Sequence, residues 1–482
     1  MVGVLIFSVV LLIYFTNLNT VWSTDHTASF LSLDYSIWSN HTLALGQVGK
    51  FSPSVDDFAY HGQYYTALAP GLALFALPFV VPGIILDGGF SLYGFANLFS
   101  ELFVAVMNAI AVVFIFKLAR LYFADSTAAF VAFAYGFSTI SWPFATFFFQ
   151  SDASAAFAVI AVYLVIKVGR DQGGFRSVIL GGLAVGAALI VDYVDVVLIP
   201  VLLAYLVLSL RRKGLASLLE SALGFLACSS VGIVAICLYN VSSFGQALVT
   251  SEQLYLGSST LFGNFSTPIY LGVLLDLFSP LRGIFLFSPV LLLGVLGFRK
   301  MLRERSGVTK EGLLLLATFL ALFLPYCAWY GPTGGLSFGP RFVIASLPFL
   351  LLPAGFAIQR DGKPRLAVAY LLYAFGVIVN GLGALTSALA GETAWLSSPF
   401  LGSTLPLFNQ GNLDQWWKGR LGAYWPVGAG IVLAAALILP LAMGYGSDQA
   451  TSDRVGVRAR DPQAGSLVRA PEDVSPQLAV PG

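Results

Sequence analysis

The sequence predicts an all-α polytopic membrane protein with about twelve transmembrane helices. Of its 482 residues, 57% are hydrophobic and only 10% are charged, whereas soluble domains carry roughly 25% charged residues. Apolar runs of about 17 to 25 residues recur along the chain, which is the length a helix needs to cross a bilayer. These runs are continuous and do not alternate with period two, so they argue against a transmembrane barrel.

The net charge and the cysteines do not indicate any other class of protein. The net charge is +1, and Cys228, Cys237 and Cys327 all lie inside apolar runs. Free cysteine in such runs behaves as a small hydrophobe, so we predict no disulfide framework. A charge balance near zero gives no reason to expect nucleic acid as a partner, and the expected surroundings are membrane lipids.

The crossings follow from the positions of the apolar runs. The first run has no basic segment before it and no clear cleavage site after it, so we interpret it as a retained first span and not as a cleaved signal. The predicted crossings are residues 2–19, 95–116, 126–147, 152–168, 177–191, 193–210, 214–240, 283–298, 311–329, 341–358, 365–390 and 424–444.

The distribution of Lys and Arg fixes the predicted orientation, because basic residues favour cytoplasmic loops. With both termini cytoplasmic, only five of the 25 basic residues lie outside, namely Lys50, Arg282, Arg341, Lys418 and Arg420. The stretch 68–86 is apolar but contains three prolines, and counting it as a crossing would move Lys117 and Arg120 outside. We therefore predict that it forms a helix in the outer interface.

This topology divides the chain into a transmembrane domain, residues 1–445, and a tail, residues 446–482. The first outer loop, residues 20–94, is long and contains the expected juxtamembrane helices; loops of this length are usually functional. Shorter outer segments are predicted at 241–282 and 392–423. The tail is rich in Asp, Arg, Pro, Ser and Gly, and we predict that it is disordered and cytoplasmic.

Ionisable residues gather at the outer boundary of the predicted helices. Asp25 and His26 follow the first crossing, Asp152 begins the fourth, and Asp192 and Asp195 join the fifth to the sixth. Charged groups at this depth are expensive unless they line a wet cavity. Capping of helix N-termini is the alternative interpretation for Asp25 and, above all, for Asp152.

The most specific segment is Trp-Tyr-Gly-Pro-Thr-Gly-Gly-Leu-Ser-Phe-Gly-Pro-Arg, residues 329–341. Its glycines allow a ligand to approach the backbone closely, and Arg341 at the start of a helix can bind a phosphate with two hydrogen bonds. The alternative is a tight turn whose arginine reaches lipid head groups.

Five segments together resemble the GT-C superfamily of polytopic glycosyltransferases. They are Ser-Thr-Asp25 after the first crossing, His61-Gly-Gln-Tyr-Tyr-Thr-Ala-Leu-Ala-Pro70-Gly in the outer loop, Gln-Ser-Asp152, Arg282-Gly-Ile-Phe-Leu-Phe-Ser-Pro289 and Gly-Gly-Leu-Ser-Phe-Gly-Pro-Arg341. Within that superfamily the chain is similar to the protein mannosyltransferase, lipid A aminoarabinose transferase and galacturonosyltransferase group. It departs from the group in two respects: Asp25-His26 stands where close relatives have Asp-Glu, and no soluble domain follows the last crossing.

The resemblance implies a GT-C-like fold and an inverting glycosyltransferase. The enzyme would move a sugar from a polyprenyl-phosphate donor to a glycan, lipid or protein acceptor, on the extracytoplasmic face of a prokaryotic plasma membrane. In that scheme Asp25 is the base, and Asp152 orients the acceptor or shares a divalent metal ion with Asp25. Arg341 and Arg282 hold the donor phosphate. His61, Tyr64 and Tyr65 complete the expected substrate site, although tyrosines are also common in an interfacial aromatic belt.

Two other interpretations stay open at this point. A transporter or a flippase for lipid-linked sugars also has about a dozen helices, but it normally has polar or broken helices near the midplane. Here Glu101 is the main charged residue in the middle of a crossing, and the other acidic residues cluster at one boundary. The second alternative is an inactive relative that only binds the carrier lipid.

Overall fold

The computed structural model describes residues 2–18, 24–46, 54–258, 263–303, 308–332, 334–358, 363–386, 396–413, 415 and 417–459. Its N-terminal half consists of α1 (Val2–Asn17), α2 (Asp25–Tyr35), the π-helical turn η1 (Ser36–Asn40), β1 (Asp57–Tyr60), β2 (Gln63–Thr66), α4 (Gly71–Asp87), α5 (Phe95–Ala119), α6 (Asp125–Ser138), α7 (Ser141–Phe144), α8 (Gln150–Gly169), α9 (Phe175–Val191), η2 (Tyr193–Val197), α10 (Leu198–Leu210) and α11 (Leu215–Phe244).

The C-terminal half is more broken. It consists of α12 (Ser251–Tyr255), α13 (Ile269–Phe278), α14 (Ile284–Phe287), α15 (Leu291–Arg303), α16 (Thr309–Ala328), η3 (Arg341–Ser346), α17 (Leu347–Leu351), α18 (Ala354–Ile358), α19 (Lys363–Leu385), η4 (Phe400–Thr404), α20 (Leu405–Asn409), α21 (Lys418–Leu421), η5 (Gly422–Tyr424) and α22 (Trp425–Ala459).

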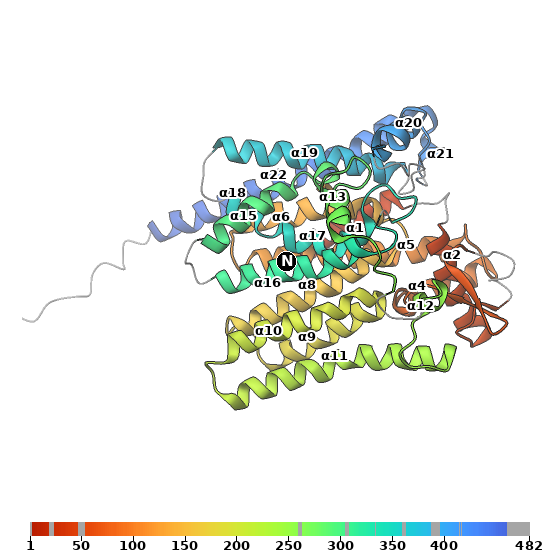
Figure 1. Ribbon diagram of the computed structural model, residues 1–482. Coiled ribbons are helices and arrows are strands. Elements are labelled where there is room, and N and C mark those ends of the chain that lie inside the picture. The colour runs from red at the N-terminus through yellow and green to blue at the C-terminus, as the bar shows by residue number, and fades with distance from the viewer. Residues whose placement is uncertain are drawn as a thin grey trace, which may run out of the picture.

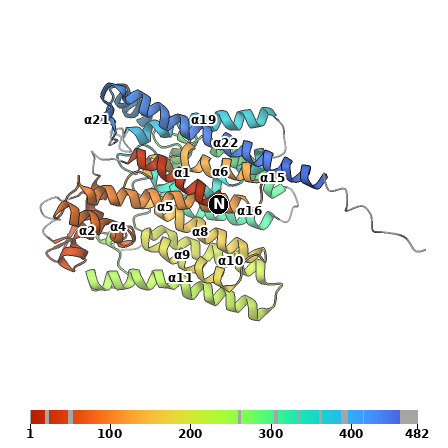
Figure 2. The same ribbon diagram turned by 180° about the vertical axis from the view of Figure 1, so that it is seen from behind.

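The long helices form one elongated bundle (Figure 1). Helices α5, α6 and α8 occupy its middle, α9 to α11 pack on one side, and α19 and α22 pack on the other, as both views show (Figures 1 and 2). Seven helices of the described part are long and apolar enough to cross a membrane. The other five predicted crossings coincide with α1, α6 and α7, α9, α14 and α15, and the series η3, α17 and α18. The polytopic helical fold is therefore confirmed.

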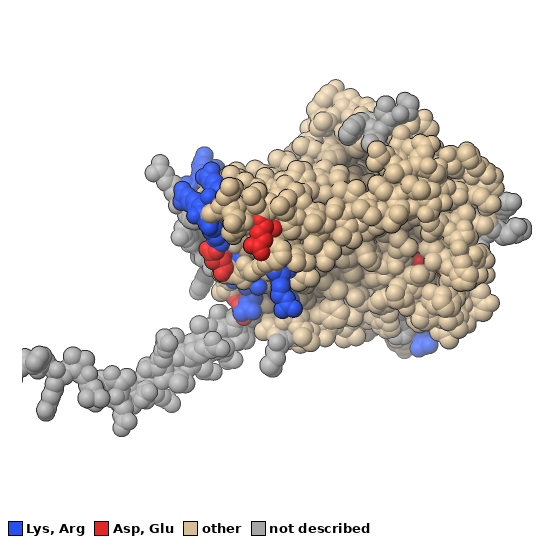
Figure 3. Space-filling view, turned by 90° about the horizontal axis from the view of Figure 1, so that it is seen from below, with Lys and Arg blue, Asp and Glu red and all other residues tan. Residues whose placement is uncertain are grey.

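Large apolar side chains cover the outside of the bundle. Leu223 and Leu238 on α11 are each 63% exposed, and Leu371 on α19 is 69% exposed. An apolar patch of this extent would be a liability in water but is the expected surface toward lipid tails. Figure 3 shows Lys and Arg gathered with Asp and Glu at one end, while most of the remaining visible surface is uncharged.

Ion pairs join the predicted cytoplasmic loops at that end. Arg170 Nε lies 3.1 Å from Glu311 Oε1 and Arg120 Nε lies 2.7 Å from Asp125 Oδ1, while Lys213 pairs with Asp171. Helix α22 runs toward the same end (Figures 1 and 2). The opposite end, called the loop end below, carries α2, α4, α12 and the hairpin β1–β2 (Figure 1). This is where the proline-rich helix predicted at 68–86 lies, as α4.

Small residues allow α9 and α11 to pack closely. A Cβ atom at Gly232 of α11 would lie 2.2 Å from the carbonyl oxygen of Gly186 on α9. Transmembrane helices associate through such small residues because lipid supplies no hydrophobic driving force between them. Gly186 and Gly232 therefore set the distance between these two helices.

The structure adds two features that differ from the expectations. The first outer loop contains a two-stranded antiparallel sheet, in which Asp57 pairs with Thr66 and Tyr60 with Gln63, so it is not purely helical. Helix α22 continues to Ala459, into the tail predicted to be disordered from residue 446. No proline occurs between residue 446 and Pro462, so nothing in that stretch forces the helix to stop earlier. Residues 460–482 of the predicted tail lie outside the described part.

Candidate active site

Helix α2 begins just after the first crossing and positions Asp25 and His26. Its N-cap is Thr24, whose hydroxyl accepts a hydrogen bond of 3.0 Å from the backbone N–H of Thr27. Threonine at this position satisfies one of the free N–H groups of the first turn. In the helix that follows, Asp25 is exposed and His26 is buried. Asp25, which the sequence predicted to follow the first crossing, thus lies in the first turn of α2.

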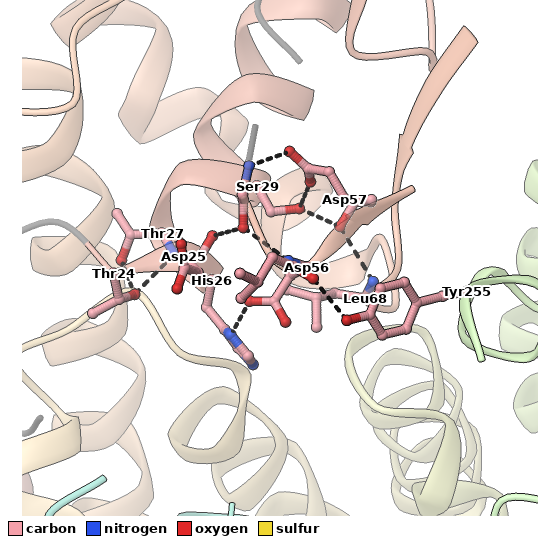
Figure 4. Close-up of polar contacts among 12 residues, drawn as sticks. Thr24, Asp25, His26, Thr27, Ser29, Asp56, Asp57, Leu68 and Tyr255 are labelled. Atoms are coloured by element: carbon pink, nitrogen blue, oxygen red, sulfur yellow. Dashed lines mark hydrogen bonds and ion pairs between the residues drawn. The ribbon is translucent and has the colours of Figure 1, made fainter. Parts of the chain in front are cut away.

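Residues 54–57 form a tight polar turn against α2 (Figure 4). Ser54 Oγ donates a 2.8 Å hydrogen bond to the carbonyl oxygen of Asp25 and accepts one of 3.0 Å from the N–H of Asp56. Ser29 Oγ donates to Asp57 Oδ1 at 2.5 Å. These bonds tie the start of the hairpin to α2, so Asp56 has a fixed position beside His26.

His26 and Asp56 are in direct contact at the loop end. His26 Nδ1 lies 2.5 Å from Asp56 Oδ2. In Figure 4 the other ring nitrogen of His26 is directed away from this contact. Within the described ranges, no residue forms a hydrogen bond with that nitrogen. The imidazole is therefore held at one nitrogen and open at the other.

Arg341 and His26 both contact the aromatic ring of Phe149. Phe149 precedes α8, and its ring centre lies 5.0 Å from that of His26. The guanidinium carbon of Arg341 lies 4.8 Å from the centre of the same ring and 5.1 Å from that of Phe342. Cation–π contacts of this kind hold the guanidinium without using its N–H groups. Nε of Arg341 is buried and has no hydrogen-bond partner within the described part of the chain.

The glycine-rich segment shapes the space around Arg341. Gly334 and Gly335 have φ values of 67° and 69°, which glycine adopts without the strain that a Cβ atom causes. A Cβ atom on Gly334 would lie 3.3 Å from Cγ of Arg341. Arg282 is fully buried and donates from Nη2 to the carbonyl oxygen of Gly335 at 2.5 Å. Arg282 thus stabilises the glycine-rich turn next to Arg341. That Arg282 contacts the donor phosphate stays a prediction.

The charges at this place influence one another. Burial lowers the pKa of His26, and the nearby positive charge of Arg341 lowers it further, while Asp56 and Asp25 oppose the shift. Burial raises the pKa of Asp56, but His26 and Arg341 outweigh it, so that the net pKa of this carboxyl is lowered. At neutral pH, His26 is therefore neutral and Asp56 is ionised.

Asp152 lies in a different environment from Asp25. It is fully buried in the first turn of α8, and its Oδ1 accepts hydrogen bonds from Asn108 Nδ2 at 2.7 Å and Ser141 Oγ at 2.6 Å. The N-cap residue of α8 is Phe149, so Asp152 does not cap the helix as the alternative interpretation supposed. Its visible role is to join α5, α7 and α8 inside the bundle.

The three other predicted substrate residues belong to the hairpin. His61 is exposed at the turn and stacks on Tyr60 with 4.1 Å between ring centres. Tyr65 packs on Phe244 at the end of α11, with 5.2 Å between centres. The N–H of Leu45 donates to the carbonyl oxygen of Tyr64 at 2.8 Å, and these contacts show how the hairpin is held. Substrate binding by His61, Tyr64 and Tyr65 stays a prediction.

The metal expectation receives no support from the donor atoms. In the part of the chain that the structure describes, no group of three or more His, Cys, Asp or Glu residues is arranged to hold a metal ion. Asp25 is exposed whereas Asp152 is fully buried with one oxygen already engaged. These two carboxylates therefore do not fit a shared metal, and we assign no metal ligand.

Sequence reasoning missed Asp56, Phe149 and Phe342. Asp56 is 30 positions from His26, and no spacing rule connects them. Asp192 was predicted from the sequence only as an acidic residue at the outer boundary of the helices. In the structure Tyr326 Oη donates to Asp192 Oδ2 at 2.5 Å, and the Tyr326 ring stacks on Phe342 with 5.2 Å between centres. Phe342 thus contacts both Arg341 and Tyr326, the hydrogen-bond partner of Asp192.

Comparison with known proteins connects this geometry to a fold. A family model described as dolichyl-phosphate-mannose-protein mannosyltransferase matches residues 78–237. The structure is similar to that of ArnT from Cupriavidus metallidurans bound to undecaprenyl phosphate, with a TM-score of 0.57 and 16% identity, over 92% of this chain and 75% of ArnT. The chain has the GT-C fold. The predicted resemblance to the GT-C superfamily is thereby confirmed.

A more distant GT-C protein shows the same likeness. The archaeal oligosaccharyltransferase AglB from Archaeoglobus fulgidus, in complex with an inhibitory peptide and a dolichol-phosphate, matches with a TM-score of 0.52 and 11% identity, over 79% of this chain and 55% of AglB. The same enzyme in complex with Zn and sulfate matches with a TM-score of 0.52 and 13% identity, over 80% of this chain and 54% of the enzyme. A search among curated proteins finds no match.

Proposed function

We propose that the chain is a membrane glycosyltransferase that moves a sugar from a polyprenyl-phosphate donor to a glycan, lipid or protein acceptor. The observation that carries the proposal is the unengaged Nε of Arg341, whose guanidinium contacts the rings of Phe149 and Phe342 in a GT-C fold. A phosphate leaving group needs positive charge or N–H donors beside it. Arg341 offers both, because its aromatic contacts leave the N–H groups available.

The family match and the fold neighbours support the choice of donor. The family model describes an enzyme that uses dolichyl-phosphate mannose, and the ArnT and AglB structures contain undecaprenyl phosphate and a dolichol-phosphate respectively. All three names refer to a polyprenyl phosphate carrier. We extend that carrier to this chain, with the phosphate placed at Arg341 and inversion at the sugar carbon.

The proposed reaction takes place on the extracytoplasmic face of a prokaryotic plasma membrane, with both termini in the cytoplasm. The loop end holds Asp25, His26 and Arg341, whereas the ion-paired basic loops lie at the opposite end of the bundle. Basic loops favour the cytoplasm. The loop end would therefore face outward.

A transfer assay with the purified protein tests the proposal. The protein would be supplied with undecaprenyl-phosphate-linked sugars, and the release of undecaprenyl phosphate would be followed with lipid, glycan and peptide acceptors. We expect release that depends on an acceptor. A protein that binds undecaprenyl phosphate but transfers none of the sugars to any acceptor would instead be the inactive carrier-binding relative.

A further inference from the structure

The contact between His26 and Asp56 places a carboxylate oxygen beside one ring nitrogen of the histidine and leaves the other nitrogen open. A histidine acts as a base when one ring nitrogen carries the proton and the other is free to accept one. A carboxylate beside the protonated nitrogen fixes the tautomer and stabilises the positive charge that forms. His26 has Nδ1 at 2.5 Å from Asp56 Oδ2, and its other nitrogen points away from that contact (Figure 4).

The surroundings hold both side chains in place. His26 is buried with its ring against Phe149. The turn containing Asp56 is bonded to α2 through Ser54, and the carbonyl oxygen of Val55 accepts a 2.7 Å hydrogen bond from Tyr255 Oη. These contacts keep both side chains in a fixed orientation, which efficient catalysis requires.

Asp25, the base predicted from the sequence, lacks this arrangement. Its side chain is exposed, and in the described part of the chain no hydrogen bond holds its carboxylate. A general base has to lie within hydrogen-bond reach of the proton that it accepts, so an exposed carboxylate that no neighbouring group orients is less suited to this role. The imidazole of His26, in contrast, is buried and lies directly beside Asp56.

We propose that His26 is the general base of the transfer and that Asp56 is its positioning residue. This inference rests on the proposed function. The free ring nitrogen of His26 accepts the proton from the acceptor hydroxyl as the acceptor oxygen bonds to the sugar carbon. The bond from that carbon to the phosphate oxygen breaks, and its electron pair stays on the phosphate, next to Arg341. The proton then returns to solvent, which restores neutral His26.

The charged and titratable groups facing His26 define the expected pH dependence. They are Asp56 from the turn, Asp25 from α2 itself and Arg341 from the start of η3. Burial and Arg341 lower the pKa of His26 from its ordinary value of 6.5. The base form is thus present at neutral pH, and the rate should fall as the pH drops through this lowered pKa.

Replacing His26 by two different amides tests the proposal. In His26→Asn the side-chain amide keeps an N–H donor near Asp56 but has no basic nitrogen, and in His26→Gln the amide reaches the position of the free nitrogen. We expect both variants to lose at least about a hundredfold in kcat, the lower end of what a general base contributes. Undecaprenyl phosphate binding, measured directly, should stay within twofold of wild type. His41→Asn is the matched control, since His41 is exposed after η1, and it should keep wild-type kcat.

The pH profile separates a catalytic from a merely structural role. Asp56→Asn removes the carboxylate that opposes the lowering of the His26 pKa, so the acidic limb of kcat should move to lower pH while kcat falls. Asp25→Asn removes a weaker opposing charge, so it should move that limb in the same direction by a smaller amount. An unchanged kcat in His26→Asn would overturn the inference, as would an acidic limb that disappears in Asp25→Asn. Loss of kcat together with undecaprenyl phosphate binding would also overturn it, because His26 would then only maintain the site.

The failure of this inference differs from a failure of the proposed function. If wild-type protein transfers no sugar from any undecaprenyl-phosphate donor, the proposed function is wrong and the inference falls with it. If wild-type protein is active and His26→Asn is equally active, only the assignment of the base is wrong.

Discussion

The guanidinium carbon of Arg341 lies 4.8 Å from the centre of the Phe149 ring, and the centre of the His26 ring lies 5.0 Å from the same point. One phenylalanine ring therefore contacts both the cation proposed to hold the leaving phosphate and the imidazole proposed to take the acceptor proton.

Substitution of Arg341 should weaken the use of the donor. A planar guanidinium can make two parallel hydrogen bonds to a phosphate, whereas lysine offers a point charge. We expect Arg341→Lys to lower kcat/KM substantially and Arg341→Ala to lower it further. Loss of a charge-assisted contact costs roughly 1.5–3 kcal/mol, which corresponds to about ten- to more than a hundredfold.

Initial rates measured against donor concentration provide the test. Arg420→Ala is the control, because Arg420 is an exposed arginine of α21. It should leave the donor curve unchanged. If the Arg341→Ala curve also coincides with that of wild type, Arg341 only reaches lipid head groups and does not bind the donor phosphate.

Removal of the Asp152 carboxylate should destabilise the protein. Oδ1 of this buried residue accepts from Asn108 and Ser141, and a buried donor left without a partner costs about 1–3 kcal/mol. We expect Asp152→Ala to lower the free energy of unfolding by an amount in this range. Asp152→Asn keeps an acceptor oxygen of nearly the same shape and should cost less.

Thermal unfolding in detergent measures this difference. Asp125→Ala is the matched control, because Asp125 pairs with Arg120 at an exposed position where such pairs contribute about 0–1 kcal/mol. Equal midpoints for Asp152→Ala and Asp125→Ala would show that the buried network contributes little. A selective loss of kcat in Asp152→Asn, with normal stability, would favour the catalytic role predicted from the sequence.

The fold was predictable because two physical requirements leave clear marks in the sequence. A helix needs a long apolar run to cross lipid, and loops rich in Lys and Arg prefer the cytoplasmic side of the membrane. All twelve predicted crossings coincide with helical segments, including the two on either side of the apolar stretch 68–86, which was not counted as a crossing. The breaks inside crossings were less visible. The separation of α6 from α7 depends on tertiary contacts such as the 3.0 Å hydrogen bond from the N–H of Ile140 to Ser288 Oγ.

The hairpin and the site show what the sequence could and could not reveal. His61 and Gly62 both have positive φ, and a two-residue turn ending in glycine between short β-prone runs is a recognisable hairpin signal, so β1–β2 was detectable. Arg341 was found because basic residues are scarce on the predicted outer side. Asp56 was not found, because its approach to His26 depends on how the hairpin docks on α2. The sequence placed Asp152 at the same membrane boundary as Asp25. Asp152, however, lies on the face of α8 that points into the bundle, where it is fully buried.

Close packing of α9 on α11 should make Gly232 intolerant of a side chain. A Cβ atom there would lie 2.2 Å from the carbonyl oxygen of Gly186, so the helices would have to separate. We expect Gly232→Ala to cost about 1–3 kcal/mol in the free energy of unfolding, as overpacking does elsewhere. In Gly430→Ala of α22 the added Cβ atom has no neighbour within 4 Å, and this control should be neutral or slightly stabilising. Equal stabilities of the two variants would contradict the packing argument.

The proposed orientation predicts which residues an impermeant reagent can reach. Gln63 is exposed in the hairpin at the loop end, and Arg212 is exposed between α10 and α11 at the opposite end, beside the ion pair of Lys213 with Asp171. With Cys228, Cys237 and Cys327 replaced by alanine, single cysteines at positions 63 and 212 would report on the two ends. In intact cells we expect an impermeant maleimide to label Gln63→Cys and to leave Arg212→Cys unlabelled until the membrane is opened. Basic loops set orientation through their preference for the cytoplasm, so labelling of Arg212→Cys alone from outside would mean that the candidate site faces the cytoplasm. Transfer would then have to use donor lipid in the inner leaflet, and the proposed extracytoplasmic acceptor would be wrong.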